Sequence, residues 1–411
     1  MIRFADVRFD CALYNGYKPC RYGNECAGCP HYQPQALPTS ARTFRPEPQP
    51  EVTGPARVLI IKTGAMGDVL RTTTLLHAIK REWPKGRITW ITAENALPLL
   101  IANPLIDELL PLTSENTATL AGREFDVLLN FEKDRTSLDL AGSVVAKRRL
   151  GYAPTAWGTP AVFNPESEYA LLLGINDDLK FRLNTRPYPQ IIAEMAALPY
   201  GRDPYILGLT AASHRRRAEI EQKIHWSGRT EVSADARALN ARVRVGLNTG
   251  CGEVFRTKQW PLENWIALVR QLAGANLEVL LMGGLAEKEL NSAILAAVPQ
   301  VIDTDTDNSL EEFFGVVDAC DILVSSDTLG MHIAIALQKY VVAMFGSTSH
   351  REIDLFDRGE KVITDFPCSP CYLKMCSLEP MCMEVMGAET VAAAVLRGVH
   401  SMHGSQPVPA R

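Results

Sequence analysis

No apolar run in this 411-residue chain is long enough to cross a bilayer, since a membrane-spanning helix needs about 20 consecutive apolar residues. A secretory signal is also lacking, because Arg3 and Asp6 interrupt the N-terminal residues and no apolar segment follows them. These absences predict a cytoplasmic protein without a transmembrane segment. They leave room for peripheral contact with the inner face of the cell membrane.

The sequence also lacks an excess of either charge sign. It carries 42 Lys and Arg residues against 47 Asp and Glu residues, a formal net charge of −5. Binding along a nucleic-acid backbone depends on a strongly basic surface, so nucleic acid is excluded as the principal partner. Apolar residues make up 46% of the chain, which excludes wholesale disorder. The length predicts two or three domains of about 150 residues each.

What the chain does contain is a repeated alternation of buried-strand and helical patterns. This alternation is typical of parallel sheets covered by helices on both faces. The predicted strands of the first series are 58–61, 88–91 and 126–131. Those of the second series are 243–247, 278–282, 322–324 and 341–345. The sequence therefore predicts an α/β fold with two doubly wound, Rossmann-like domains, 56–210 and 243–366, and an interdomain connection over 211–242.

Cysteine is concentrated near the two ends of the chain. The first cysteine-rich segment is a module over 1–33, which a Pro-rich linker over 34–55 follows. The second is a finger over 367–385, which a C-terminal helix and tail over 386–411 follow. The two groups are Cys11, Cys20, Cys26 and Cys29, and Cys368, Cys371, Cys376 and Cys382. In a reducing cytoplasm such groups indicate metal sites rather than disulfides. Four thiolates suit zinc, a single iron or an iron–sulfur cluster. We therefore expect structural zinc or iron at one or both groups, with unligated thiols as the alternative for the first.

The loop after the first predicted strand, 62–72, is a candidate for chemistry. Loops at the carboxyl ends of such strands border the binding crevice, and Gly64 and Gly67 permit close approach of a ligand to the backbone. Asp68 starts a helical pattern that continues over 69–79, so it is either a functional residue of the crevice or an N-cap. Neither G-x-G-x-x-G nor G-K-[ST] is present here, which argues against dinucleotide or P-loop binding.

Two loops of the second domain are further candidates. Thr249 and Gly250 follow its first strand and Lys258 comes later in the same loop, so this loop can receive a nucleotide diphosphate. The segment 325–332 runs from a strand into an apolar helix, and its hydroxyls, helix-start amides and histidine can converge on an anion. The alternatives, which the spacing leaves open, are a solvated lysine, a helix N-cap and a buried histidine.

The tract 303–307 contains the D-x-D pattern, which holds a divalent cation in some nucleotide-sugar enzymes. It directly precedes Ser309-Leu310-Glu311-Glu312, a capping box. Acidic residues stabilise a helix N-terminus without any metal. We therefore predict a helix start here rather than a cation site.

Five separated motifs together resemble glycosyltransferase family 9, the ADP-heptose:lipopolysaccharide heptosyltransferases. They occur in the family's order and spacing, and the likeness runs from about residue 56 to residue 384. The motifs are the strand, turn and helix of 57–74, Asn248-Thr249-Gly250, Lys258-Gln259-Trp260-Pro261, Met282-Gly283-Gly284 and 326–334. The cysteines of the finger are similar to a run near the C-terminus of many members. The resemblance implies a GT-B fold, in which two Rossmann-like domains face each other and hold the acceptor mainly with the first and the ADP-sugar mainly with the second.

The resemblance further implies an inverting transfer of heptose that needs no catalytic cation. Asp68 corresponds to the general base, with Gly67 and Arg71 on the acceptor side. The donor-binding positions that the motifs imply are Thr249, Gly250, Lys258, Gly283, Gly284, Glu287, Asp327, Thr328, Gly330, Met331 and His332. The implied donor is an ADP-sugar, ADP-heptose first, and the implied acceptor is a glycan such as a lipopolysaccharide core, a lipid-linked glycan or a protein. Two departures from the family stand out, namely the N-terminal cysteine module and the position of Gly330, one place later than in many members.

Two other functions remain open. A different GT-B enzyme, either a transferase of another nucleotide-sugar or an epimerase, would use the same diphosphate site, which hardly contacts the sugar. An iron–sulfur or redox-sensing protein would use the clustered cysteines and leave the five motifs idle.

Overall fold

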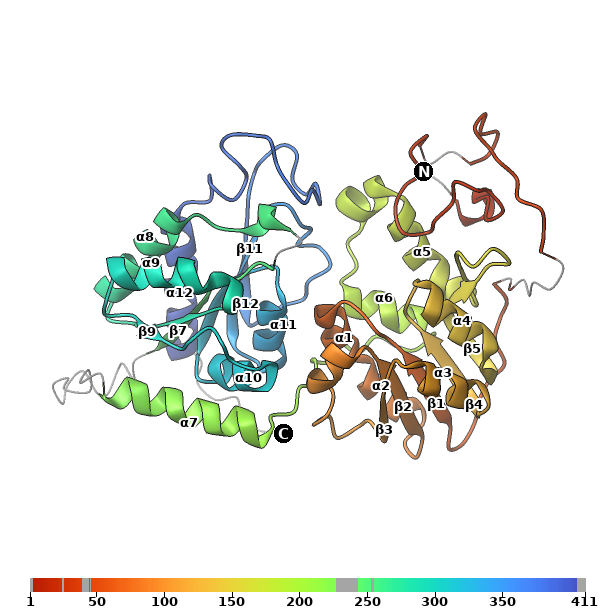
Figure 1. Cartoon of the computed structure of the whole chain (residues 1–411), viewed down its shortest axis with the longest axis horizontal. Coiled ribbons are helices and arrows are strands. Elements are labelled where there is room, and N and C mark those ends of the chain that lie inside the picture. The colour runs from red at the N-terminus through yellow and green to blue at the C-terminus, as the bar shows by residue number, and fades with distance from the viewer. Residues whose placement is uncertain are drawn as a thin grey trace. The chain divides into compact units, whose positions relative to one another are not determined.

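The computed structural model describes residues 3–23, 26–38, 44, 46–226, 243–252 and 255–404. The chain divides into two compact units. Unit 1 is Met1–Gly208 with Arg351–Asp354, and unit 2 is Leu209–His350 with Leu355–Arg411. Each unit contains a six-stranded sheet with helices packed against it (Figure 1). In the described part of the chain, no helix is long and apolar enough to cross a membrane.

The sheet of unit 1 has the strand order β3-β2-β1-β4-β5-β6 and is parallel except for β6. Its strands are β1 (Arg57–Ile61), β2 (Arg87–Thr92), β3 (Glu108–Pro111), β4 (Glu124–Asn130), β5 (Val145–Pro154) and β6 (Pro160–Val162). The chain leaves β1 toward β2 and β3, and then continues on the other side of β1 with β4. The point between β1 and β4, where the strand order reverses, is the usual ligand position in such sheets.

The helices of unit 1 differ from the prediction at one place. They are α1 (Met66–Thr72), α2 (Leu75–Glu82), α3 (Ser114–Ala121), α4 (Arg135–Ser143), α5 (Glu168–Ile175) and α6 (Tyr188–Met195), with short turns η1 (Phe4–Asp6), η2 (Glu94–Leu99), η3 (Pro165–Ser167) and η4 (Leu179–Leu183). The helical pattern over 69–79 is split between α1 and α2. Thr73 Oγ1 donates to the Leu70 carbonyl (2.6 Å) and Thr74 Oγ1 to the Asp203 carbonyl (2.5 Å). Threonine hydroxyls that bond to backbone carbonyls compete with the helix, so it ends there.

The N-terminal module and the segment predicted as a linker both belong to unit 1 and pack against its sheet domain. Tyr14 Oη donates to the carbonyl of Pro160 (2.6 Å), and the Phe44 ring lies edge-on to Phe163 with ring centroids 4.9 Å apart. The module lies beside α5 in Figure 1, where it is red. The described residues of the predicted linker therefore lie along this unit.

The sheet of unit 2 is wholly parallel and has the order β12-β11-β10-β7-β8-β9. Its strands are β7 (Arg244–Asn248), β8 (Glu278–Met282), β9 (Ile302–Asp303), β10 (Ile322–Ser326), β11 (Tyr340–Phe345) and β12 (Gly359–Ile363). Its helices are α7 (Ala211–Trp226), α8 (Leu262–Gly274), α9 (Lys288–Ala297), α10 (Leu310–Asp318), α11 (Leu329–Ala336) and α12 (Ala388–Gly404), with turns η5 (Arg256–Lys258) and η6 (Leu285–Glu287). Buried Trp260 and Trp265 pack edge to face, and Trp260 Nε1 donates to the Met386 carbonyl just before α12 (2.8 Å). The prediction of two doubly wound α/β domains is confirmed.

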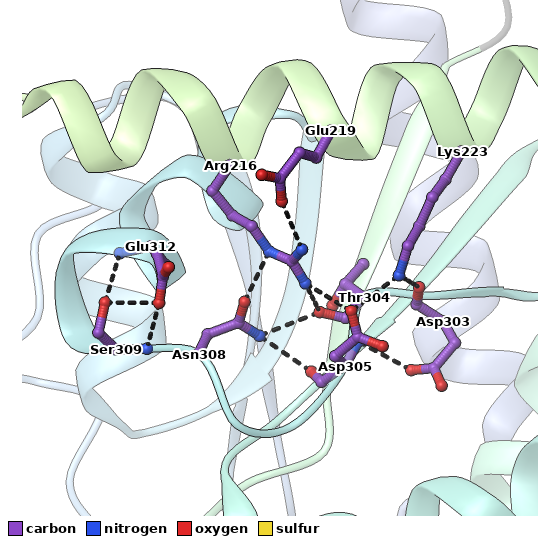
Figure 2. Close-up of polar contacts among 9 residues, drawn as sticks. All are labelled: Arg216, Glu219, Lys223, Asp303, Thr304, Asp305, Asn308, Ser309 and Glu312. Carbon is purple, nitrogen blue, oxygen red and sulfur yellow. Dashed lines mark hydrogen bonds and ion pairs between the residues drawn. The ribbon is translucent and has the colours of Figure 1, made fainter.

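Helix α7, which the sequence places in the interdomain connection, belongs to unit 2 in the structure. Figure 2 shows how its side chains hold the loop after β9. Arg216 donates to Asn308 Oδ1 (2.7 Å) and to the Thr304 carbonyl (2.8 Å), and it pairs with Asp305 (2.6 Å). Lys223 pairs with the same carboxylate (2.7 Å). Helix α7 is thus bonded to the edge of the sheet of unit 2 through polar contacts.

The D-x-D tract contributes to this network. Burial opposes ionisation of Asp305, but Lys223 and Arg216 outweigh it and hold the pKa of Asp305 below its usual value. Ser309 is the N-cap of α10, with its Oγ accepting from the Glu312 amide (3.3 Å) and its amide donating to Glu312 Oε2 (2.8 Å). The predicted capping box and helix start are confirmed, and the central carboxylate of the tract already has two cationic partners.

Candidate functional site

The first half of the candidate site lies in unit 1, on the loop after β1. Asp68 is the third residue of α1, whose N-cap is Ala65, so Asp68 does not cap the helix. Its side chain is 36% exposed, and its Oδ1 accepts from Arg71 Nε (3.0 Å) and pairs with Arg71 Nη2 (2.8 Å). Gly67 precedes it in the first turn of α1. A carboxylate with this exposure can be reached by the hydroxyl group of a substrate.

Arg71 connects Asp68 to the rest of unit 1. Its Nη2 lies 3.7 Å from Glu352 Oε2, and its Cζ lies 3.8 Å from the centroid of the Tyr188 ring. Burial disfavours the charge on Arg71, but Asp68 and Glu352 outweigh burial and hold the pKa of Arg71 above its usual value. The guanidinium is therefore a permanent cation that orients the Asp68 carboxylate.

Glu132, which follows β4, holds the loop that carries Asp68. Its Oε1 accepts from Lys62 Nζ (2.6 Å) and from the amides of Thr63 and Gly64 (both 2.8 Å). The Lys62 side chain is only 4% exposed; burial opposes its charge, but Tyr188 and Glu132 keep its pKa above the usual value. One carboxylate thus joins the ends of β1 and β4 at the point where the strand order reverses.

The sequence reasoning assigned no role to Glu132 or Glu352. A signal for Glu132 existed, because it follows the predicted strand 126–131 at a carboxyl end. That β4, which precedes Glu132, lies next to β1 becomes known only from the strand order. Glu352 carries no such signal, since it reaches Arg71 from a distant segment of the chain.

The second half of the candidate site lies in unit 2, where β10, β7 and β8 are adjacent and each is followed by predicted donor positions. Asn248 Nδ2, at the end of β7, donates to Ser325 Oγ (2.9 Å) and to Thr328 Oγ1 (3.0 Å). A Cβ on Gly330 would lie 2.6 Å from Asn248 Nδ2, which is too close for any side chain. Glycine at position 330 therefore lets α11 begin against Asn248.

Lys258 lies beside the start of α11. Its Nζ donates to the Asp327 carbonyl (2.8 Å) and lies 3.3 Å from Asp327 Oδ2. Thr328 is the N-cap position of α11, although its side chain makes no cap hydrogen bond. The structure thus brings Lys258, Asp327 and the first amides of α11 together, and cations and free helix-start amides are the groups that bind phosphate.

A third set of predicted positions surrounds Glu287. Gly284 donates its amide to Glu287 Oε2 (2.9 Å), and a Cβ on Gly250 would lie 3.2 Å from that carboxylate. A Cβ on Gly283 would lie 2.9 Å from the Glu287 Cβ, so glycine is required there for space. The structure therefore groups these predicted positions around one carboxylate.

Thr249 lies beside this set and has a partner that the sequence reasoning missed. Its Oγ1 lies 2.6 Å from Asn291 Oδ1 on α9, and it is also within hydrogen-bond distance of the Met282 carbonyl (3.2 Å). Both Thr249 and Asn291 are buried. No pattern around Asn291 indicates this contact, because α9 follows a different strand from Thr249.

Besides Gly330, two predicted donor positions lie inside α11, namely Met331 and His332. The Met331 side chain is fully buried in the core, so the group that it can offer to a ligand is its backbone amide. His332 is buried on the same helix, and its amide donates to the Thr328 carbonyl (3.3 Å).

All ten cysteines are free thiols. Burial raises the pKa of Cys382 to about 11, and the neighbouring thiols Cys371, Cys368 and Cys376 add to this effect, so the four sulfurs of the finger lie near one another. Among the described residues, no group of three or more His, Cys, Asp or Glu side chains is close enough to hold a metal ion. The finger therefore gathers its four thiols without the spacing of a formed metal site.

This chain is similar to known proteins. Residues 210–382 match the model of glycosyltransferase family 9 (heptosyltransferase). The chain is 23% identical to lipopolysaccharide heptosyltransferase 2 of Salmonella typhimurium over 308 residues, which cover 71% of this chain and 83% of the relative.

Two solved structures have a similar fold. A family 9 glycosyltransferase from Veillonella parvula superposes with a TM-score of 0.61 at 16% identity and covers 84% of this chain and 97% of its own. The ADP-heptose lipopolysaccharide heptosyltransferase II of E. coli superposes with a TM-score of 0.56 at 18% identity and covers 85% of this chain and 100% of its own.

Proposed function

We propose that this chain is a glycosyltransferase of family 9 that transfers heptose from ADP-heptose to a glycan acceptor with inversion and without a catalytic cation. Transfer requires a base for the acceptor and groups that stabilise the departing diphosphate. The observation that carries the proposal is that unit 1 has an accessible carboxylate, while unit 2 has a cation beside the helix-start amides of α11. The acceptor that we favour is a lipopolysaccharide-core-like or other lipid-linked glycan, reached in the cytoplasm at the inner face of the cell membrane.

The acceptor side of the reaction requires a base. In the proposed step the acceptor hydroxyl oxygen attacks the anomeric carbon of heptose, and Asp68 accepts the proton of that hydroxyl. The new glycosidic C–O bond forms on the face opposite the diphosphate, and the bond from the anomeric carbon to the diphosphate breaks with its electron pair going to ADP. Arg71 holds Asp68 by two contacts to Oδ1, and Glu132 fixes the loop from which α1 begins.

The donor side requires groups that stabilise the departing diphosphate. Negative charge grows on ADP as the bond breaks, and preorganised donors lower the energy of that state. Lys258 carries a positive charge beside the start of α11, and the amides of Leu329, Gly330 and Met331 lie in the first turn of that helix. Glu287, next to Gly250 and Gly284, is proposed to accept hydrogen bonds from the nucleoside.

A donor panel tests the proposed function. Purified protein is incubated with ADP-heptose, ADP-glucose, UDP-glucose or GDP-mannose and a core glycan acceptor, and the products are measured by mass spectrometry and NMR. We expect transfer from ADP-heptose alone, with the anomeric configuration inverted. Transfer from another donor would favour the other GT-B transferases, and isomerisation of a donor without transfer would favour an epimerase.

We also propose that the finger cysteines hold structural zinc or iron. The four thiols lie near one another, since Cys371, Cys368 and Cys376 add to the effect of burial on the pKa of Cys382, and Cys376 Sγ accepts a hydrogen bond from the Leu378 amide (3.4 Å). The finger also contacts the donor loop, because Thr257 Oγ1, next to Lys258, donates to the Leu373 carbonyl (2.7 Å). For the N-terminal group the proposal depends on cysteine spacing alone.

Elemental analysis of the purified protein checks the metal proposal. We expect two equivalents of zinc or iron if both groups bind metal and one equivalent if only the finger does. Cys371→Ser should lose one equivalent and raise the KM for ADP-heptose through the loop of Lys258, whereas Cys320→Ala, outside both groups, should keep the metal content.

EDTA should leave activity unchanged over minutes, since Lys258 and the α11 amides are the proposed charge-stabilising groups. A metal-free protein with full activity would contradict the proposal, and prompt EDTA inhibition reversed by magnesium or manganese would contradict the cation-independent mechanism.

A further inference from the structure

Lys133 lies in an unusual environment in unit 1. It follows Glu132 after β4, and its Nζ donates to the Gly16 carbonyl of the N-terminal module (3.3 Å). The same Nζ lies 5.5 Å from the centroid of the Tyr17 ring and 5.3 Å from that of Tyr152. A Cβ on Gly174 of α5 would be 2.5 Å from Nζ, so the glycine makes room for the ammonium group. The N-terminal module and unit 1 therefore enclose this lysine together.

The described residues provide Lys133 with no ion pair. The nearby carboxylates have other partners: Glu132 accepts from Lys62 and two amides, and Glu352 faces Arg71. An ammonium group has three N–H donors, and here one of them is used, in a long hydrogen bond. Lys133 therefore holds a charge and hydrogen-bond donors that the protein leaves largely uncompensated.

The charges around Lys133 are of both signs. Burial is the main cause that lowers the pKa of Lys133 to about 8, and the ammonium of Lys180 on η4 lowers it further. Lys62 at the end of β1 acts in the same direction, whereas Glu132 and Glu352 partly oppose these effects. The rings of Tyr17 and Tyr152 face the group from the module and from β5. An anion bound here would relieve the repulsion between the lysines.

We propose that Lys133 binds an oxyanion of the acceptor, a phosphate or a carboxylate, and that Gly16 and Tyr17 of the N-terminal module form one wall of this site. The site is at the carboxyl end of β4, beside the strand whose loop leads to Asp68, which is where the topology places a ligand. That the oxyanion belongs to the acceptor rests on the proposed function. The module is then part of acceptor recognition.

The proposal predicts a defined pH dependence. Below pH 8 the Lys133 ammonium is charged and binds the oxyanion, and above pH 8 it loses its proton and the attraction with it. A bound oxyanion in turn favours the charged form and raises the pKa of Lys133. Arginine stays charged throughout this range, so Lys133→Arg should remove the pH dependence.

A direct binding measurement tests the site without any transfer reaction. The lysines of the full chain are reductively methylated with ¹³C-formaldehyde, the Lys133 signal is assigned with Lys133→Arg, and its titration is followed by NMR with inorganic phosphate or with acetate. We expect an upward shift of at least about one pKa unit, equal to a tenfold preference for the charged form. The anion, phosphate or acetate, that shifts the pKa of Lys133 more identifies the class of oxyanion. The pKa of exposed Lys85 should not change with either anion. A Lys133 titration that neither anion moves would overturn the proposal.

Acceptor kinetics test its connection to function. Lys133→Met should raise the KM for the core glycan at least tenfold, while kcat and the affinity for ADP-heptose stay within about threefold. Tyr17→Ala should act in the same direction, whereas Tyr22→Ala, an exposed tyrosine of the same module, should not. A lower thermal stability and kcat with an unchanged acceptor KM would mean that Lys133 only locks the module in place, and would overturn the proposal. Absence of transfer by the wild type would instead reject the proposed function, while the phosphate-binding result would stand on its own.

Discussion

Replacing Asp68 with asparagine is expected to lower kcat for heptose transfer by about 10²–10⁴-fold, the usual effect of losing a general base. Asparagine has almost the same shape but cannot accept the proton of the acceptor hydroxyl. The affinity for ADP-heptose should stay within a few-fold, because the proposed donor-binding groups are in unit 2. Single-turnover kinetics at saturating donor and acceptor, together with calorimetric donor binding, measure the two effects separately.

The structure makes this substitution easy to interpret. Ala65 is the N-cap of α1, so Asp68→Asn removes no helix cap, and the stability loss should be about 1–3 kcal/mol, because buried Arg71 loses one of its two carboxylate partners. Asp139→Asn is a matched control, since Asp139 is also an aspartate on a helix of unit 1 that pairs with an arginine, Arg135. A folded Asp68→Asn enzyme with near-normal turnover would show that the base is elsewhere.

Lys258→Ala is expected to lower kcat/KM by about 10²–10³-fold, as for the loss of one preorganised group that stabilises developing negative charge. Lys258 supplies the cationic side chain that contacts Asp327 next to the start of α11, and alanine leaves only neutral amides for the diphosphate. Part of the loss should appear as weaker binding of ADP-heptose and of the product ADP.

Steady-state kinetics and ADP binding check this prediction. Arg270→Ala, which removes an exposed cation from α8 of the same unit, should change neither quantity. An unaltered kcat/KM in Lys258→Ala would transfer the charge-stabilising role to another group. Restoration of Lys258→Ala activity by magnesium would show that a cation can replace the lysine.

Much of the architecture could be predicted because parallel strands buried on both faces have a local signature. Runs such as 58–61 and 341–345 are apolar at every position, and glycine loops follow them. The Ser309 capping box was equally readable, since its two partners are three residues apart. The α1–α2 break was missed, because the hydroxyl of Thr74 bonds to Asp203, a partner distant in sequence.

By itself, the sequence determined the two doubly wound domains, the candidate loops at the carboxyl ends of their strands and the positions of Asp68, Lys258 and the glycines around Glu287. These features depend on residues close together along the chain or on the burial of whole strands. Only the tertiary structure decided that Glu132 holds the Asp68 loop, that Glu352 faces Arg71 and that the N-terminal module encloses Lys133. Those contacts join segments far apart in sequence, and the strand order and packing that bring them together follow from the burial of the whole sheet, which no local pattern encodes.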